Sequence, residues 1–444
     1  MRKQTFIAGA FAILALASCS NDEVVSNVQS AQLAQQSIGF SPMTKGATRG
    51  VVGDVTELGN FAVTAYLATA LPDGDNIYIS SSSPATITAR TIGSVYNGME
   101  NIQINVDNTG AADYDNVAQT NYWPYTFDAT TNNYVTTTKL DFVGISPASI
   151  GSTTDADGKF TASTTGGKIQ KYKAGTDDVL FAFADDKQQS DGAVPMHFRH
   201  LLSLVQFQAK RAAGFEVSIG KIDLVNIPNE ASATITANGD SSTEPTITWT
   251  METTAEKQNI SVTGATITAE GDDADPQALG NPSFVIPQDA STITYDAAKI
   301  DGKTKYDTTN QSAEDNTNGK TIAVEQRDDN NHWNSTDNQA YSGTPLFLRV
   351  SVRIKNPSGD YSLGSATTYD DIYFAVKSDW KPGKKYIYTM LFGGVKGPNG
   401  QAGSTSTDIA GGTYNDGKKP FTSSPITFTC DVEAWVDYDA NVAF

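Results

Sequence analysis

Apolar and polar residues alternate in many short runs along this chain, and the period of two predicts β-strands. In the clearest run, residues 346–355, five apolar side chains occupy the even positions and mostly polar ones the odd positions. Alternate side chains of a strand point to opposite faces, so this run predicts a strand with one buried face. The same reasoning predicts strands at residues 61–66, 205–210 and 221–227 and, from less regular apolar runs, at residues 179–184 and 371–376.

Clusters of Gly, Asn, Asp and Ser separate these runs, and helix signals are nearly absent. The pattern predicts an all-β fold made of antiparallel sandwiches. The length of 444 residues favours more than one domain. We place a boundary in the polar stretch 186–192, which gives an N-terminal domain over residues 50–190 and a C-terminal domain over residues 191–444.

The C-terminal domain contains two polar segments with little periodicity. Residues 296–343 are interpreted as an insertion with long loops and residues 393–425 as a flexible lead. After the lead comes a final alternating run, residues 426–435, which predicts a last strand. Its apolar face carries Ile426, Phe428, Cys430, Val432 and Ala434.

The N-terminus has the pattern of a secretory signal. Arg2 and Lys3 precede a short apolar run, and small residues lead up to Cys19. The run is too short to span a bilayer, so we expect residues 1–18 to be a signal peptide that is removed. Residues 16–19 resemble a bacterial lipobox, which implies that cleavage behind Ser18 leaves a lipidated Cys19. That lipid is then the only predicted attachment of the precursor to a membrane.

The charge of the chain excludes one class of partner, and its cysteine content excludes an internal disulfide. The formal net charge is −19, and loss of the two cations Arg2 and Lys3 with the signal takes it to −21. A surface this acidic repels nucleic acid, so no nucleic-acid partner is expected. Apart from Cys19, the chain has one cysteine, Cys430, so the mature protein cannot form an internal disulfide and depends on core burial.

The sequence offers no catalytic constellation. It lacks a zinc-binding His-Glu-x-x-His motif, a P-loop, a dinucleotide fingerprint and a nucleophile elbow. His197 and His200 are three apart in a predicted strand, which favours structural hydrogen bonds over a shared metal. Aromatic residues 122–125 are more typical of packing than of sugar stacking, although both interpretations stay open. We therefore predict a protein that is not an enzyme and has no cofactor and no metal site.

Several loose motifs, taken together in their order along the chain, resemble the fimbrillin family of Bacteroidetes, the type V pilins. The motifs are residues 37–40 before Thr48 and Arg49, residues 61–66, 196–205 and 285–288, and residues 380–388. The resemblance covers essentially the whole chain. It implies two tandem transthyretin-like antiparallel β-sandwich domains with Greek-key connections, and export to the outer membrane as a lipoprotein.

The resemblance also implies a route of assembly. An arginine-specific protease would cut between Arg49 and Gly50 and release a propeptide, residues 19–49, with the strand around Ile38 and Phe40. The groove left behind would accept the last strand of a neighbouring subunit, through the apolar face of residues 426–434. The implied partners are the processing protease and other fimbrial subunits, and the implied location is a cell-surface fimbrium that serves adhesion.

A second interpretation remains open beside the structural one. The chain would be a fimbrial tip adhesin or a surface lipoprotein, and its polar insertion would bind a glycan or a host protein. The last strand distinguishes the two. A stalk subunit must donate residues 426–435, whereas a tip subunit has no distal neighbour and keeps this strand in its own domain.

Overall fold

The computed structural model describes most of the chain between residues 36 and 434, and every absence reported below concerns this described part alone. The described ranges are residues 36–44, 58–71, 76–80, 83–86, 90–128, 130, 133–135, 138–239, 243–252, 257–289, 294–295, 341–342, 347–375, 379–393, 413–414 and 427–434. The protein is all-β, as predicted, and the described residues include one short α-helix, α2 (Ala148–Ser152). None of the described helices is long and apolar enough to cross a bilayer.

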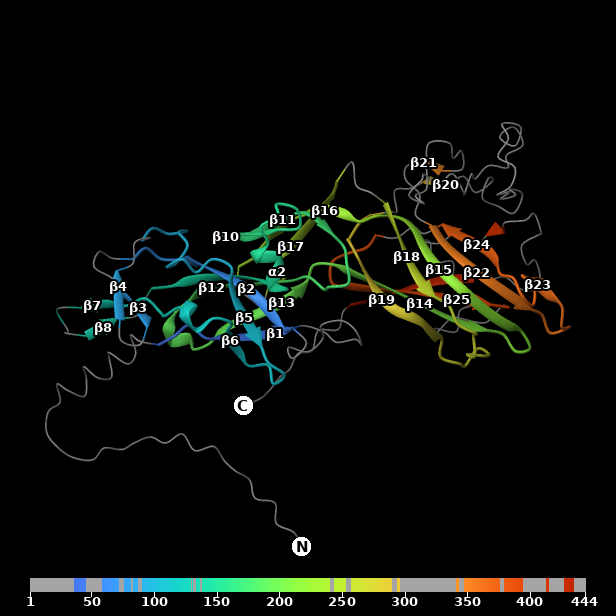
Figure 1. The fold of residues 1–444 in the computed structure, drawn as a ribbon, viewed down its shortest axis with the longest axis horizontal. Coiled ribbons are helices and arrows are strands. Elements are labelled where there is room, and N and C mark those ends of the chain that lie inside the picture. The colour runs from blue at the N-terminus through green and yellow to red at the C-terminus, as the bar shows by residue number, and fades with distance from the viewer. Residues whose placement is uncertain are drawn as a thin grey trace, which may run out of the picture.

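A seven-stranded sheet organises the first half of the molecule (Figure 1). Its strands, in spatial order, are β1 (Phe40–Thr44), β13 (Val194–His200), β12 (Leu180–Lys187), β9 (Leu140–Ser146), β2 (Asn60–Leu67), β5 (Ile102–Val106) and β6 (Ala112–Tyr114). One face packs on a cluster that includes Ile38, Phe40, Phe61 and Phe198. The opposite face buries Ala62, Val143 and Ile145 and the residues beside them in a second cluster.

A four-stranded sheet covers that second face. It consists of β10 (Phe160–Ser163), β11 (Gly166–Lys173), β16 (Glu230–Thr236) and β17 (Thr246–Met251). Ala231, Ala233 and Ile235 alternate along β16 and are buried against the larger sheet.

The smaller elements are the hairpins β3 (Asn76–Ser80) with β4 (Ser83–Thr86) and β7 (Thr126–Asp128) with β8 (Asn133–Val135), the 3-10 turns η2 (Val117–Gln119) and η3 (Gln189–Asp191), and the pair β20 (Thr294–Tyr295) with β21 (Tyr341–Ser342).

The second half is a sandwich of two sheets with its own core, at the opposite end of the elongated molecule (Figure 1). One sheet has the order β19 (Gln277–Val285), β14 (Ser203–Arg211), β25 (Lys384–Phe392) and β27 (Thr427–Ala434). The other has the order β18 (Lys257–Thr263), β15 (Glu216–Pro228), β22 (Phe347–Lys355), β24 (Asp370–Ala375) and β26 (Thr413–Tyr414), with β23 (Tyr361–Leu363) paired to β22.

The predicted strands are present, and their burial follows the predicted period. Along β22 the even positions Leu348, Val350, Val352 and Ile354 are all buried, whereas the odd positions from 349 to 355 are partly exposed. Most pairs are antiparallel, as expected, but β1 pairs with β13 and β14 with β25 in parallel. Strands far apart in the sequence are free to meet in either direction, and local alternation does not encode which.

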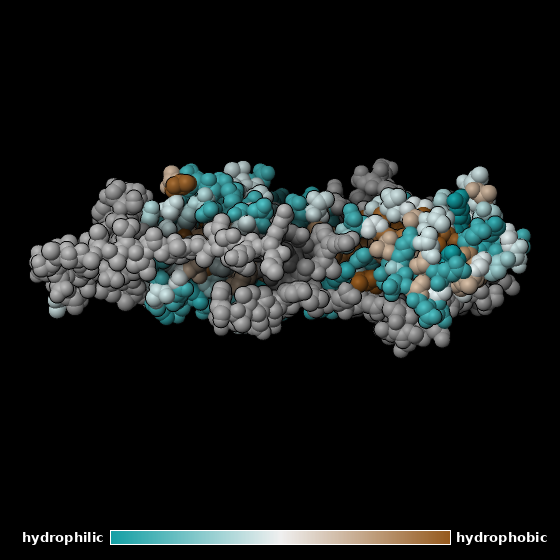
Figure 2. Space-filling model, turned by 90° about the horizontal axis from the view of Figure 1, so that it is seen from below, coloured by the Kyte–Doolittle hydropathy of each residue, from teal (hydrophilic) through white to brown (hydrophobic). Residues whose placement is uncertain are grey.

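The chain passes more than once between the two halves. β13 leads into β14 through two fully buried leucines, Leu201 and Leu202, and β15 leads into β16 at Asn229. The β16–β17 hairpin therefore pairs with β11 of the first half although it lies well beyond residue 190. The side of the molecule in Figure 2 is mainly hydrophilic among its coloured residues, in keeping with the acidic composition.

Candidate functional site: the first strand and its groove

The first described segment, residues 36–44, ends in the edge strand β1 of the seven-stranded sheet. Its side chains alternate strictly. Ile38, Phe40 and Pro42 are buried, whereas Ser41 and Met43 are exposed. Proline has no amide to donate to a ladder, and an edge strand is where it is tolerated.

Hydrogen bonds hold this segment from two sides. On one side the Ile38 amide donates to the Asn121 carbonyl at 2.8 Å, and the Trp123 amide donates to the Gln36 carbonyl at 3.1 Å. On the other side the Val194 amide, at the start of β13, donates to the Gly39 carbonyl at 2.9 Å. The segment thus lies in a groove between residues 121–123 and β13.

Aromatic rings form the floor of this groove. The ring of Phe40 packs edge-on against Phe61 at 5.9 Å, Phe142 at 5.8 Å and Tyr114 at 6.2 Å between centroids. Ile38 is completely buried in the same cluster. Burial of these two side chains contributes about 4–6 kcal/mol of gross transfer free energy, at roughly 2–3 kcal/mol each.

Tyr114 connects the floor to the backbone of the segment. Its hydroxyl donates a 3.1 Å hydrogen bond to the Ile38 carbonyl. Burial raises the pKa of Tyr114 well above its ordinary value, so the phenol stays neutral and keeps its proton to donate. This contact joins residues 76 positions apart, and no local pattern predicts it.

The predicted processing residues lie just outside the described segments. Cys19, Arg49 and Gly50 fall in residues 1–35 and 45–57, of which the structure describes nothing. β1 ends at Thr44, five positions before Arg49. A cut between Arg49 and Gly50 would therefore break the covalent link between all of β1 and the rest of the sheet, so that only non-covalent contacts would hold the strand.

The predicted last strand is present as β27, at the edge of its sheet. It pairs antiparallel with β25 over eight residue pairs, from Leu391 opposite Thr427 to Lys384 opposite Ala434. The register sets Phe428, Cys430 and Val432 opposite Met390, Tyr388 and Tyr386, three residues of the second core. Ile426 lies outside the described residues.

The histidine and aromatic candidates His200, Trp123 and Tyr125 are buried, and their contacts serve the fold. His200 is buried, and its Nδ1 lies 2.6 Å from Oδ2 of Asp178. Burial raises the pKa of Asp178, and the adjacent histidine opposes that shift. Trp123 and Tyr125 are buried, which confirms the packing interpretation. Among the described residues no group of His, Cys, Asp and Glu is arranged to hold a metal ion.

Comparison with known proteins gives one family match. Residues 68–408 match a family model described as fimbrillin-like. No curated protein matches the chain.

Solved structures similar to this chain come from Bacteroides and Porphyromonas species, among others. Two, from Bacteroides ovatus and Bacteroides uniformis, carry the name "putative cell adhesion protein". They are 12% and 11% identical with TM-scores of 0.37 and 0.33, and each covers 90% of this chain and 98% of its own. A fimbrilin from Porphyromonas gingivalis is 8% identical with a TM-score of 0.32 and the same two coverages. Since these scores are low, the family model alone carries the assignment.

Proposed function

The chain belongs to the fimbrillin-like family, and from this premise we propose that it is a structural subunit of a cell-surface fimbrium that serves adhesion. The observation that carries the proposal is the position of β1. The apolar side chains of this strand are buried in a groove, yet the strand lies at a sheet edge and ends five positions before Arg49 in the sequence. A strand so placed completes the fold of the precursor and is removable by one cut.

In the proposed maturation, Cys19 carries lipid and anchors the precursor to the outer membrane. An arginine-specific protease then cuts between Arg49 and Gly50 and frees residues 50–444 from the lipid. The released segment takes Ile38 and Phe40 with it. Phe61, Phe142 and the β13 edge are then exposed to water, and an open edge beside an apolar floor is a template for pairing with another chain.

We propose that the last strand of another subunit fills this groove. Three properties of β27 support the assignment. It lies at a sheet edge, it is the last described element, and its eight residues are more than the five of β1 and nearly as many as segment 36–44 contains. Ile426, Phe428, Cys430, Val432 and Ala434 would enter the positions vacated by Ile38, Phe40 and Pro42 and those next to them. Main-chain pairing then gives affinity, and the alternating side chains give register.

This role needs no catalysis, cofactor or metal. The partners of the protein are other fimbrial subunits and the processing protease, and the mature protein resides on the cell surface. Family membership supports a structural rather than an enzymatic role.

One observation favours a second candidate, a fimbrial tip subunit. β27 is paired with β25 of its own chain along its whole length. A tip subunit has no distal neighbour, so it would retain this pairing, whereas a stalk subunit must release it.

The two candidates are separated by cutting the protein in vitro. Purified chain starting at Ser20 is treated with an arginine-specific protease and analysed for ladders that resist detergent. We expect ladders from the wild type and none from Arg49→Ala or from a chain that ends at residue 425. Ladders from the shortened chain would exclude β27 as the donor strand, and a cut chain that stays monomeric would favour the tip.

A further inference from the structure

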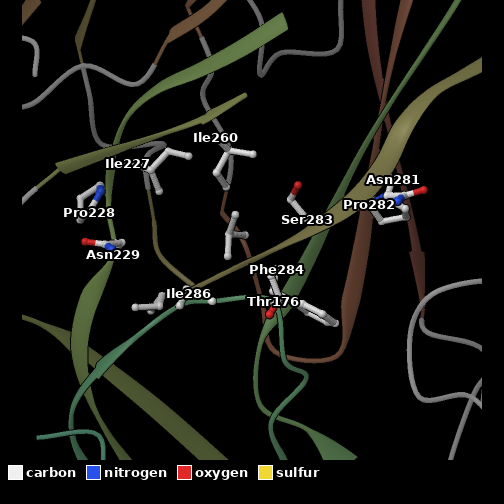
Figure 3. Close-up of a pocket in the computed structure, with 13 residues that line it drawn as sticks. Thr176, Ile227, Pro228, Asn229, Ile260, Asn281, Pro282, Ser283, Phe284 and Ile286 are labelled. Carbon is white, nitrogen blue, oxygen red and sulfur yellow. The ribbon is translucent and has the colours of Figure 1, made fainter. Parts of the chain in front are cut away.

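The β16–β17 hairpin begins at the seam between the two halves of the molecule. Residues 227–229, which lead into β16, form part of the wall of a cavity of about 600 Å³ there (Figure 3). From this base β16 runs beside β11, and β17 returns beside β16. β17 is therefore an outer strand of the four-stranded sheet (Figure 1).

β17 has a free hydrogen-bonding edge. The Glu252 amide, directly after the strand, donates to the Glu230 carbonyl at 3.1 Å. Bonds in an antiparallel ladder alternate, so the even-numbered residues of β17 bond to β16. The backbone amides and carbonyls of Ile247, Trp249 and Met251 then point away from β16, and no other described strand pairs with them.

Nothing in β17 hinders the pairing of another strand. Residues 246–251 contain no charged residue and no proline, and their ladder with β16 has no bulge. Proteins usually protect sheet edges with short strands, charges, proline or bulges. The other outer strands of the four larger sheets have such protection: Pro42 in β1, Asp113 in the three-residue β6, the four-residue length of β10, Lys257 in β18, Pro282 in β19, the two-residue length of β26, and Asp431 and Glu433 in β27.

The side chains of β17 also favour pairing with a strand of the same sequence. The three threonines of the strand are exposed, whereas Ile247, Trp249 and Met251 are partly buried against the core. The indole of Trp249 donates a 2.9 Å hydrogen bond to the Leu201 carbonyl, which fixes the strand on the molecule. Uncharged segments of six residues with high β-propensity and no proline pair readily with copies of themselves.

We infer that β17 pairs antiparallel with β17 of a second copy of this chain, about a two-fold axis at Trp249. In this register Trp249 lies opposite Trp249 of the second copy, and Ile247 lies opposite Met251. The three residues with free backbone groups thus face one another, with two hydrogen bonds for each facing pair. The two four-stranded sheets become one continuous sheet.

The charge of the protein favours contact at this edge over contact elsewhere. With a formal charge of −19, two copies repel each other through most of their surfaces. Residues 246–251 carry no charge, so the copies can approach there. β17 is separate from β1 and β27, so the inference does not depend on the assembly proposed above.

The first test measures association of uncut protein, the chain from Ser20 with Arg49→Ala. Sedimentation velocity at rising concentration should show an equilibrium between monomer and dimer. Ile247→Pro removes an outward amide and leaves the ladder with β16 intact. It should weaken dimerisation by roughly tenfold or more, because two hydrogen bonds of the dimer are lost by symmetry. Ile247→Val keeps the amide and is the matched control.

The second test examines the register with cysteines, in a chain from Ser20 with Cys430→Ala, which removes the one remaining thiol. Thr248 lies opposite Thr250 of the second copy, and neither lies opposite itself. Chains with Thr248→Cys and chains with Thr250→Cys carry different tags, and they are mixed and mildly oxidised. We expect roughly fivefold more heterodimer than either homodimer, because diagonal positions are too far apart for a disulfide. Thr161→Cys, exposed on β10, replaces Thr250→Cys in the control mixture.

Three results would overturn the inference. The first is a chain that stays monomeric at every concentration and does not cross-link. The second is homodimers as abundant as heterodimers, which would mean another register or random collision. The third is unchanged dimerisation in Ile247→Pro with a melting temperature equal to that of Ile247→Val. If Ile247→Pro does not fold, the cysteine mixtures decide alone.

Discussion

At the scale of single residues, Phe40 packs the first strand against the aromatic floor of its groove. Its ring contacts three other aromatic rings. Replacement by alanine removes these contacts and leaves a cavity, so Phe40→Ala should lower the free energy of unfolding by about 3–4 kcal/mol. Urea denaturation of uncut protein measures this value. Met43→Ala on the exposed face of the same strand should change it by less than about 0.5 kcal/mol, and equal effects of the two changes would contradict the role of Phe40.

A second residue-scale prediction concerns pH. Asp223 of β15 is buried and accepts hydrogen bonds from Lys221, Ser261 and Arg349. Burial alone would raise its pKa, but these three donors outweigh burial and hold the pKa below its ordinary value of 3.8. A depressed pKa means that the stabilisation is present above pH 3.8 and is lost as the pH falls through the folded-state pKa.

Asp223→Asn should therefore lower the free energy of unfolding by about 2–3 kcal/mol at neutral pH, because charge-assisted hydrogen bonds are lost. The difference from wild type should shrink as the pH falls below 3.8. Urea denaturation over a pH series tests this, with the exposed Asp155→Asn as control. A difference that does not change with pH would mean that the carboxylate charge is not what stabilises β15.

The sequence predicted some residue environments and missed others for a physical reason. Alternation placed Leu348 to Ile354 on a buried face, and packing was the favoured interpretation for Trp123. The sequence pattern did not predict the ion pair of Arg349 with Asp223, which are 126 positions apart. Nor did it predict the hydrogen bond from Tyr114 to Ile38, which are 76 positions apart.

At the scale of elements, β1 should behave as a separable part. A chain that starts at Gly50 lacks β1, so its groove should bind a synthetic peptide of residues 36–44. Because the peptide is a ligand of the folded state, the melting temperature should rise with peptide concentration. Thermal unfolding at several peptide concentrations measures this. A peptide with Ile38→Asp and Phe40→Asp is the control, and stabilisation by that peptide would contradict occupation of the apolar floor.

The positions of most strands could be predicted from the sequence, whereas the pairing between strands could not. Period-two alternation depends on local sequence, and it located β2, β14, β15 and β22. Pairing depends on contacts between distant segments. No local run predicted that β1 pairs in parallel with β13 or that β16 pairs with β11.

At the scale of the whole molecule, the crossings at residues 201–202 and 229 and the returning hairpin favour unfolding of both halves together. Trp123 lies in the first core and Trp380 in the second. With 5-fluorotryptophan incorporated at all five tryptophans, the ¹⁹F resonances assigned to Trp123 and Trp380 should report the same urea midpoint. Midpoints that differ by about 1 M or more would show that the halves unfold independently.

If the groove of β1 exchanges one strand for another, the Val194 amide reports whether the groove is occupied, because this amide donates to the Gly39 carbonyl. Hydrogen exchange of this amide is measured in uncut protein, in cut protein that ends at residue 425, and in the cut full-length polymer. We expect slow exchange in the uncut protein, fast exchange in the cut protein that ends at residue 425, and slow exchange again in the full-length polymer. Fast exchange of Val194 in the polymer would contradict it, because the groove would then stay open while the subunits assemble through another surface.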